Sequence, residues 1–461
     1  MKVNTKYFYT LLTFILCSFI GIIFALINKF PLVYSDTGTY IVSGYEFNLP
    51  FDRPVFYGLF LRYTSLKLSL WLTILAQSLI AVFLIREMIL YYHNEKKNAN
   101  LLTIVFVFLL SMSSSLSYVV SELIADVFTS YLVLCLLLWQ NPNLTKIKRG
   151  IITLIFCYSL ITHNSHFLIV FAAIACLVMI NFLTKSGKGK VIFQLFSLTV
   201  IILILNLSFN YFKHKGFKLS RVANTFIFAR MLESGAVHKY VKDHNSGGDI
   251  ITDHINDIPM NSVEFLWNTD QSILYLDSCL PKKGWELCWC EKDGLFKSYI
   301  KKVLLYPVSS EMYLKNISES FLRQLWFYKV EALGPMTTDY PVKINVKTYL
   351  KFDYPSYITA IQYRRVLYFN LTNRILFCTT LLSMTIIIIG MFYLRSRKFN
   401  IGIVIFTIFY LVNAFICSAF SNTIERYTTR ISWILPLFAI IAIVLVIKKV
   451  KDRRSSPLPV V

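Results

Sequence analysis

Long apolar runs limit this chain to very few folds. Four of the clearest cover residues 11–27, 70–90, 191–207 and 401–420. Each is close to the roughly 20 residues that an α-helix needs to cross about 30 Å of hydrocarbon. Lipid offers no hydrogen-bond partner to a peptide group, so such runs must be helical. The sequence therefore predicts an all-α polytopic membrane protein.

The composition agrees with this class, because 56% of the residues are hydrophobic and only 16% are charged. A soluble protein has about 45–50% apolar and about 25% charged residues. The first apolar run is followed by many others and lacks a small-residue cleavage site. We therefore interpret it as a start-transfer anchor and not as a cleavable signal peptide.

Basic residues produce a formal net charge of +22, and their positions explain it. They cluster in short connections between apolar runs and in the tail, which is typical of cytoplasmic loops. Because topology accounts for most of the charge, no nucleic-acid partner is predicted. The clusters contain Lys96, Lys97, Lys146, Lys148, Arg149, Lys185, Lys188, Lys190, Arg395, Arg397, Lys398, Lys448, Lys449, Lys451, Arg453 and Arg454.

One path of about ten spans places every basic cluster in the cytoplasm. It predicts a multi-pass membrane protein with both termini cytoplasmic. The spans are expected at about 8–28, 69–91, 101–117, 123–139, 151–162, 167–183, 190–211, 371–394, 399–420 and 431–447. Three units follow: a transmembrane module at 1–211 with a first outer loop at 29–68, a mainly helical extracytoplasmic domain at 212–370, and a transmembrane module with a basic tail at 371–461.

The first outer loop contains Asp36 and, later, Asp52, Arg53 and Tyr57. Asp36 follows the first span directly, where burial facing a cavity could raise its pKa and make it a general base. The local sequence by itself favours the alternative, an N-cap for a short helix starting at Thr37. Arg53 could pair with Asp52 or Asp36, or bind an anionic group in a bidentate manner.

Glu122 and Asp126 lie four residues apart, close to the outer end of the predicted fourth span. On a helix this spacing puts both carboxylates on one face. Carboxylates buried at membrane depth require a polar cavity or a cation partner. The alternative is that Ser121 and Glu122 cap this helix.

His163 and His166 lie in a tight outer corner. They could bind a phosphate, relay protons or help to hold a metal. Two histidines without a third ligand are a weak metal signal, so no metal site is predicted.

Arg426 and Tyr427 lie in the last outer corner. An arginine beside a tyrosine at a membrane surface suits a lipid phosphate head group. The alternative is the aromatic-belt and snorkelling pair that ends many spans. All these candidates fall on the same outer side, which the alternatives do not explain together.

Three of the nine cysteines, Cys279, Cys288 and Cys290, fall in the predicted outer domain. The outer side is oxidising, so a disulfide from Cys279 to either Cys288 or Cys290 is expected, with one thiol left over. The other six lie in predicted spans, where cysteine usually serves as a small apolar residue.

These features together resemble the glycosyltransferase C (GT-C) superfamily, polytopic enzymes that take a sugar from a polyprenyl-phosphate carrier on the outer membrane face. The likeness covers roughly 1–210 and 371–447. Many GT-C enzymes pair two acidic residues in the first loop, whereas Asp36 has Ser35 and Thr37 as neighbours. The matching features are Asp36, Asp52-Arg53-Pro54 with Tyr57, Ser121-Glu122-Leu123, the corner at 163–166 where many relatives have arginine, and Arg426-Tyr427 before a Pro-containing final span.

The outer segment is more similar to that of uncharacterised bacterial GT-C-like membrane proteins. They have similar runs to Phe228-Ala229-Arg230, Glu264-Phe265-Leu266-Trp267 and Tyr306-Pro307.

The resemblance implies a glycosyltransferase of the bacterial inner (plasma) membrane that moves a sugar from a polyprenyl-phosphate donor to an envelope glycan, lipid or protein. Asp36 would deprotonate or orient the acceptor hydroxyl. The donor phosphate would be bound by Arg53, His163, Arg426 and Tyr427, and the cavity would be lined by Asp52, Tyr57, Glu122, Asp126 and His166. No cofactor is assigned, and a divalent metal stays open.

Two other functions remain as alternatives: a transporter or flippase of lipid-linked or anionic solutes, and a non-catalytic envelope scaffold. A transporter would place ionisable residues at mid-membrane depth and broken helices in paired halves. Here the candidates gather at the outer rim, which favours the transferase.

Overall fold

The computed structural model describes residues 5–93, 97–185, 187–214, 216–244, 247–268, 272–335 and 341–455. Within these ranges the regular structure is helical, and β-structure is limited to two isolated bridges, Leu32–Glu122 and Leu333–Leu367. The all-α class is therefore confirmed.

Six apolar stretches of the described chain are long enough to cross a membrane, which supports a membrane protein. They contain α5 (Leu70–His93), α10 (Asn164–Thr184), α11 (Gly189–His214), α21 (Asn370–Leu394), α22 (Arg397–Phe420), and α23 (Arg426–Ser432) together with α24 (Ile434–Ser455). The other predicted spans are shorter or interrupted helices: α1 (Thr5–Gly21) with α2 (Ile23–Asn28), α6 (Ala99–Ser113), α8 (Val127–Trp139) and α9 (Lys146–Thr162).

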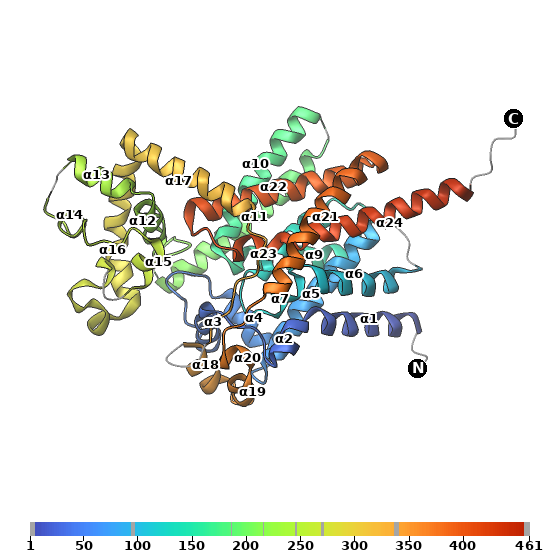
Figure 1. Cartoon of the computed structure of the whole chain (residues 1–461), viewed down its shortest axis with the longest axis horizontal. Coiled ribbons are helices and arrows are strands. Elements are labelled where there is room, and N and C mark those ends of the chain that lie inside the picture. Colours follow the sequence, from blue (N-terminus) through green and yellow to red (C-terminus); the bar gives the residue numbers. More distant parts are fainter. Residues whose placement is uncertain are drawn as a thin grey trace.

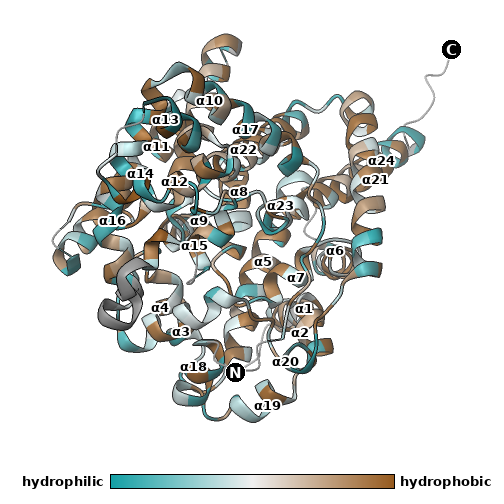
Figure 2. Cartoon of the chain, turned by 60° about the vertical axis from the view of Figure 1, so that its left-hand side comes forward, coloured by the Kyte–Doolittle hydropathy of each residue, from teal (hydrophilic) through white to brown (hydrophobic). Residues whose placement is uncertain are grey.

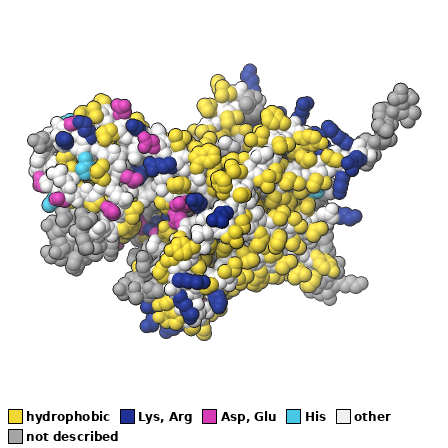
Figure 3. All heavy atoms as spheres, viewed as in Figure 1, with side chains coloured by type: hydrophobic (Ala, Val, Ile, Leu, Met, Phe, Trp, Pro, Cys, Tyr) yellow, Lys and Arg dark blue, Asp and Glu magenta, His cyan; other side chains and the backbone are white. Residues whose placement is uncertain are grey.

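A second group of helices lies at one end of the bundle, on the left in Figure 1. α1 begins and α24 ends at the opposite end (Figure 1). Acidic side chains gather over this group, whereas hydrophobic side chains cover most of the remaining face (Figure 3). The group comprises α12 (Ala223–Glu233), α13 (Ala236–His244), α14 (Ile250–Asp253), α15 (Ser262–Trp267), η1 (Ile273–Ser278), α16 (Cys279–Leu305) and α17 (Pro307–Leu325).

The predicted outer unit at 212–370 contributes to two hydrophobic cores. Residues between 222 and 317 form one core together with Ala419 of α22, and it contains the fully buried Phe228, Phe265 and Trp289. The part from 330 to 369 joins the core of the bundle. Hydrophilic residues are frequent on α13 and α16, whereas α21 is mostly hydrophobic (Figure 2). The later part contains α18 (Pro341–Tyr349), α19 (Tyr354–Thr359) and α20 (Ile361–Arg364).

Glycines fix the first outer loop against its neighbours. This loop forms α3 (Ser35–Glu46) and α4 (Phe56–Thr64). A Cβ added to Gly44 would lie 2.0 Å from the carbonyl oxygen of Gly58, and one added to Gly38 would lie 2.7 Å from Pro341. Only glycine permits these approaches, which hold α3 between α4 and α18.

Candidate active site

Asp36 lies in the first turn of α3, at the end of the bundle that carries α12–α16. The helix begins at Ser35, so the alternative of an N-cap before Thr37 is wrong. Thr37 explains the earlier start, because its hydroxyl accepts a hydrogen bond from the Tyr34 N–H at 2.9 Å. The same hydroxyl donates to the Leu123 carbonyl at 3.0 Å. The Asp36 carboxylate is thus not needed as a cap.

Two arginines from distant parts of the chain bind the Asp36 carboxylate. Arg53 Nη1 lies 2.9 Å from Oδ1, and Arg426 Nη1 lies 3.2 Å from Oδ2. Arg53 also contacts Asp52, with Nη2 at 2.7 Å and Nε at 3.0 Å from Oδ2. Burial by itself would raise the pKa of Asp36, but Arg53 and Arg426 outweigh it and hold that pKa below its ordinary value. Asp36 is therefore ionised, and both its oxygens have a cationic partner.

Arg426 joins this carboxylate to a second one, Asp126. Its Nε lies 3.1 Å from Asp126 Oδ2, while Arg430 Nη1 lies 2.5 Å from Oδ1. Arg430 is only 1% exposed and also donates to Asn413 Oδ1 at 2.6 Å. Our sequence reasoning gave Arg430 no role. Its spacing of four residues from Arg426 could have indicated one, because it puts both guanidinium groups on one face of a helix.

The predicted helical pairing of Glu122 and Asp126 is wrong. α7 (Leu116–Ser121) ends before Glu122, which is extended, and α8 begins after Asp126. The cause is a contact that local sequence does not reveal. Leu32 N–H donates to the Ser121 carbonyl at 2.9 Å, and Leu123 N–H donates to the Leu32 carbonyl at 2.9 Å.

Neither Ser121 nor Glu122 caps α8, so the capping alternative is wrong as well. Asp126 occupies the N-cap position and makes no side-chain capping bond. Its carboxylate is free to bind the two arginines of α23.

Glu122 lies in the same electrostatic environment but lacks a comparable partner. It is 2% exposed, and its Oε1 has no hydrogen-bond partner. Burial raises the pKa of Glu122 to about 8, although Arg426 partly opposes this. Glu331, which no sequence pattern indicated, accepts a hydrogen bond from the Arg426 N–H at 3.4 Å. Burial raises its pKa too.

Aromatic rings flank the arginines. The Arg426 guanidinium lies 4.5 Å from the ring centroid of Tyr34, and that of Arg430 lies 5.0 Å from the ring of Tyr427. Such contacts stabilise a partly desolvated cation. The Tyr427 hydroxyl is within 2.7 Å of Ser421 Oγ. Tyr427 therefore supports the arginines through its ring.

The two histidines of the outer corner have different surroundings. His163 precedes α10, and its Nδ1 accepts a hydrogen bond from the Ser165 N–H at 3.2 Å. Burial lowers the pKa of His163 to about 4, with Asp126 partly opposing the shift. His166 is fully buried, with Nε2 at 2.8 Å from Thr129 Oγ1 and Nδ1 at 2.6 Å from the Ser159 carbonyl.

Tyr57 is also fully buried, and its hydroxyl donates to Gln77 Oε1 at 2.6 Å. Ion pairs connect six of these side chains into one network, which we call the arginine–aspartate network. Its members are Asp36, Asp52, Arg53, Asp126, Arg426 and Arg430. His166 and Tyr57 are bonded within the core.

A cavity of about 310 Å³ opens beside Arg53. It lies between the first outer loop, the end of α11 and the start of the α12–α17 group. The basic lining residues Lys218 and Arg221 were not singled out from the sequence. Both follow a predicted span on its outer side, where the positive-inside pattern expects few basic residues. This departure from the pattern could have indicated a site for an anion. The cavity is lined by Leu49, Pro50, Phe51, Arg53, Asn210, His214, Gly216, Lys218, Leu219, Ser220, Arg221 and Cys290.

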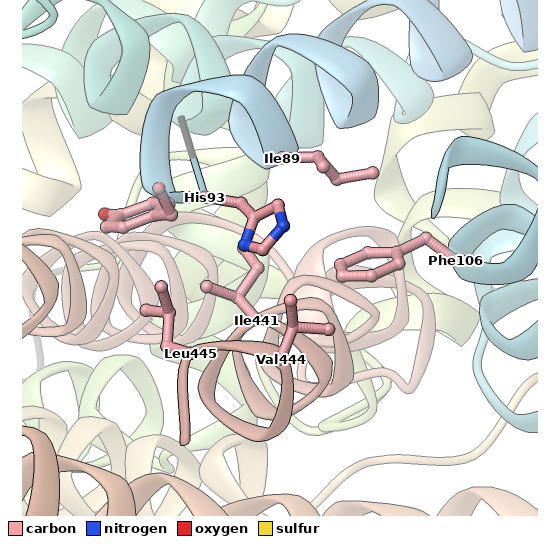
Figure 4. Close-up of a pocket in the computed structure, with 7 residues that line it drawn as sticks. Ile89, His93, Phe106, Ile441, Val444 and Leu445 are labelled. Carbon is pink, nitrogen blue, oxygen red and sulfur yellow. The ribbon is translucent and has the colours of Figure 1, made fainter. Parts of the chain in front are cut away.

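The bundle is more tightly packed where α5 ends. There a void of about 10 Å³ lies between α5, α6 and α24. It is lined by mostly apolar side chains, among them Ile89, His93, Phe106, Ile441, Val444 and Leu445 (Figure 4). This volume is at the lower limit for a single water molecule.

The outer-domain cysteines include one that forms a disulfide and one free thiol. Cys288 is disulfide-bonded, and Cys290 is a free thiol. The side chain of Cys279, the predicted partner, lies outside the described residues. Within the described ranges, no three His, Cys, Asp or Glu side chains are grouped to hold a metal ion.

No known protein family, curated protein or solved structure matches this chain. Its function must therefore be argued from the site itself.

Proposed function

We propose that this chain is a GT-C-like membrane glycosyltransferase, acting at the outer face of a bacterial inner membrane. It would transfer a sugar from a polyprenyl-phosphate donor to an envelope glycan, lipid or protein. The observation that carries the proposal is the arginine–aspartate network. In it Asp36 of α3 pairs with Arg426 of α23 and with Arg53, and Arg53 also lines a basic cavity.

The network contains the groups that such a transfer needs. The acceptor oxygen attacks the anomeric carbon, the bond from that carbon to the phosphate oxygen breaks, and polyprenyl phosphate leaves with the electron pair. Arg53 and Arg426 would stabilise the charge on the leaving phosphate. Asp36 would orient the acceptor hydroxyl and take up its proton.

Asp36 is a weak base while both arginines contact it, because they lower its pKa. A donor phosphate that draws Arg53 away would raise that pKa toward its ordinary value. Binding of the donor would thus prepare Asp36 for the acceptor.

The topology belongs to the same proposal. We infer about ten spans, with the shorter helices α1–α2, α6, α8 and α9 completing the six long ones. Cytoplasmic termini agree with the positions of the start of α1 and the end of α24. Both lie at the end of the bundle opposite the α12–α17 group (Figure 1).

The test replaces Asp36 with Asn in cells that make the protein. Surface glycans, glycolipids and glycoproteins are compared with those of wild type, together with the pool of polyprenyl-phosphate sugar. We expect one glycosylated product to disappear and its donor to accumulate. The control is Asp257→Asn, the same change at an exposed position in the α12–α17 group. Unchanged products and donor pool, with normal amounts of the Asp36→Asn protein, would contradict the proposal.

A further inference from the structure

We propose that the cavity beside Arg53 is a binding site for a phosphate group, and that this phosphate competes with Asp36 for Arg53. The site rests on the proposed function, in which Arg53 binds the donor phosphate, and it adds to that function a cavity with its own shape and charge. Its volume of about 310 Å³ is at the lower end of the range for small-ligand pockets.

One backbone and one side-chain hydrogen bond connect the walls of the cavity. Arg221 N–H donates to the Phe51 carbonyl at 2.9 Å, which joins the segment after α11 to the first outer loop. Asn210 Nδ2 donates to the Lys218 carbonyl at 2.7 Å, which ties the same segment back to α11. Phe51 also packs against Trp289, with ring centroids 5.7 Å apart. These contacts position Phe51, Lys218 and Arg221 relative to one another without a ligand.

The charged lining is basic. Lys218 is exposed and forms no ion pair within the described ranges, so its ammonium group is available to an anion. Arg221 pairs with Glu286, and Arg53 pairs with Asp36 and Asp52. None of these three carboxylates lines the cavity. A phosphate would meet three cationic side chains, the arrangement that proteins use for phosphate recognition.

His214 supplies an additional polar atom. It lines the cavity from the end of α11, and its Nε2 is buried without a hydrogen-bond partner. A buried ring nitrogen without a partner is costly, and a turn of the ring toward the cavity would let a phosphate satisfy it.

Arg53 connects the cavity to the arginine–aspartate network. It lines the cavity and also binds Asp36, so one guanidinium group serves two anionic partners. A phosphate in the cavity would weaken the Arg53–Asp36 contact. Linkage is reciprocal, so removing the charge of Asp36 must strengthen phosphate binding by the same coupling.

The phosphate could belong to a lipid or to a soluble molecule. The lipid source has a structural argument, since Phe212 and Phe217 beside the cavity are strongly exposed. The Tyr211 and Phe217 rings stack with their centroids 4.4 Å apart, next to the C-terminal end of α11. Both sources share the phosphate chemistry, and the experiment must separate them.

The test measures binding to the full-length protein in nanodiscs of phosphatidylcholine. One arm adds inorganic pyrophosphate, and the other includes phosphatidic acid in the disc. We expect Lys218→Glu to weaken binding roughly tenfold, because a charge-assisted contact becomes a repulsion. The control Lys301→Glu makes the same change at an exposed site on α16 outside the cavity and should have no effect. Asp36→Asn should tighten binding several-fold.

Each result decides part of the proposal. Pyrophosphate binding alone assigns the site to a soluble phosphate compound, and phosphatidic acid binding alone assigns it to a lipid. Equal affinity of wild type and Lys218→Glu for both probes would overturn the site. Unchanged affinity in Asp36→Asn would overturn the competition for Arg53. Because binding is measured without sugar transfer, failure of the site and failure of the proposed function are distinguishable.

Discussion

Half-buried Asp36 and buried Glu122 both lie close to Arg426, but their carboxyl groups have opposite pKa shifts. Asp36 receives an arginine nitrogen on each oxygen, and its pKa is lowered. Glu122 has an oxygen without a partner, and burial raises its pKa to about 8. The contrast teaches that direct arginine contacts, and not nearness to positive charge, decide which carboxyl group is ionised. Two carboxyl groups whose pKa values diverge in this way are a common feature of active sites.

The largest expected effect is a loss of stability when the ion pairs of the second ionised carboxylate, Asp126, are removed. Asp126→Asn leaves Arg430, which is 1% exposed, with an uncompensated charge. Breaking a buried pair in this way costs about 3–5 kcal/mol, so the purified protein should unfold at a clearly lower temperature. Lys239→Gln, which disrupts the surface pair with Asp243, should leave the melting temperature unchanged. Equal melting of the two variants would show that the network does not stabilise the fold.

The second effect concerns the bridging role of Arg426. Arg426→Lys keeps the charge, but one ammonium group cannot reproduce a guanidinium that contacts Asp36 and Asp126 through separate nitrogens. We expect the transfer rate to fall roughly 100-fold. The matched control is Arg323→Lys on the exposed face of α17, which should retain full activity. Retained activity in Arg426→Lys would mean that charge alone matters at this position.

The raised pKa of Glu122 predicts that the stability of the protein depends on pH. A raised pKa means that folded Glu122 binds more protons than the unfolded chain between pH about 4.5 and 8. Its contribution is therefore full below that window and is lost as the pH rises, by at most about 1.4 kcal/mol per pH unit.

Glu122→Gln should remove this loss and make the protein more stable than wild type at pH 8. Thermal unfolding of both proteins at pH 5 and pH 8 measures it, with Glu319→Gln at an exposed site of α17 as control. If Glu122→Gln loses as much stability as wild type between pH 5 and pH 8, another group causes the pH dependence.

The smallest effect is expected at His163. Its pKa of about 4 keeps the ring neutral between pH 6 and 8, so it does not contribute to pH dependence there. His163→Asn retains a capping acceptor for the Ser165 N–H and should change stability by less than about 1 kcal/mol. A pH profile of transfer between pH 6 and 8 that changes in this variant would show that the histidine titrates during the reaction.

Features that depend on local sequence, such as helix type and apolar length, were predicted correctly. Apolar length alone identified the helical membrane class, and the six helices long enough to cross a membrane lie where hydropathy placed them. Asp36, Arg53 and Arg426 were expected to lie on one side of the membrane. Their contacts could not be predicted in detail, because Arg426 is 390 positions away from Asp36 along the chain.

Long-range contacts explain the errors. Glu122 and Asp126 have helical spacing, but the bridge to Leu32 pulls Glu122 out of the helix. Glu331 lies in an extended segment without a periodic pattern, so only the folded chain brings it to Arg426. The basic cavity requires the first outer loop and the segment after α11 to meet, and that meeting depends on tertiary packing.

The central claim is that Asp36 and its arginines form the site of sugar transfer. The most direct measurement incubates purified protein with lipid extract and acceptor fraction from the cells that make it, and follows free polyprenyl phosphate by mass spectrometry. Wild type and Asp257→Asn should release it, and Asp36→Asn should release at least about 100-fold less. Release by Asp36→Asn at the wild-type rate, or no release by wild type, would contradict the account.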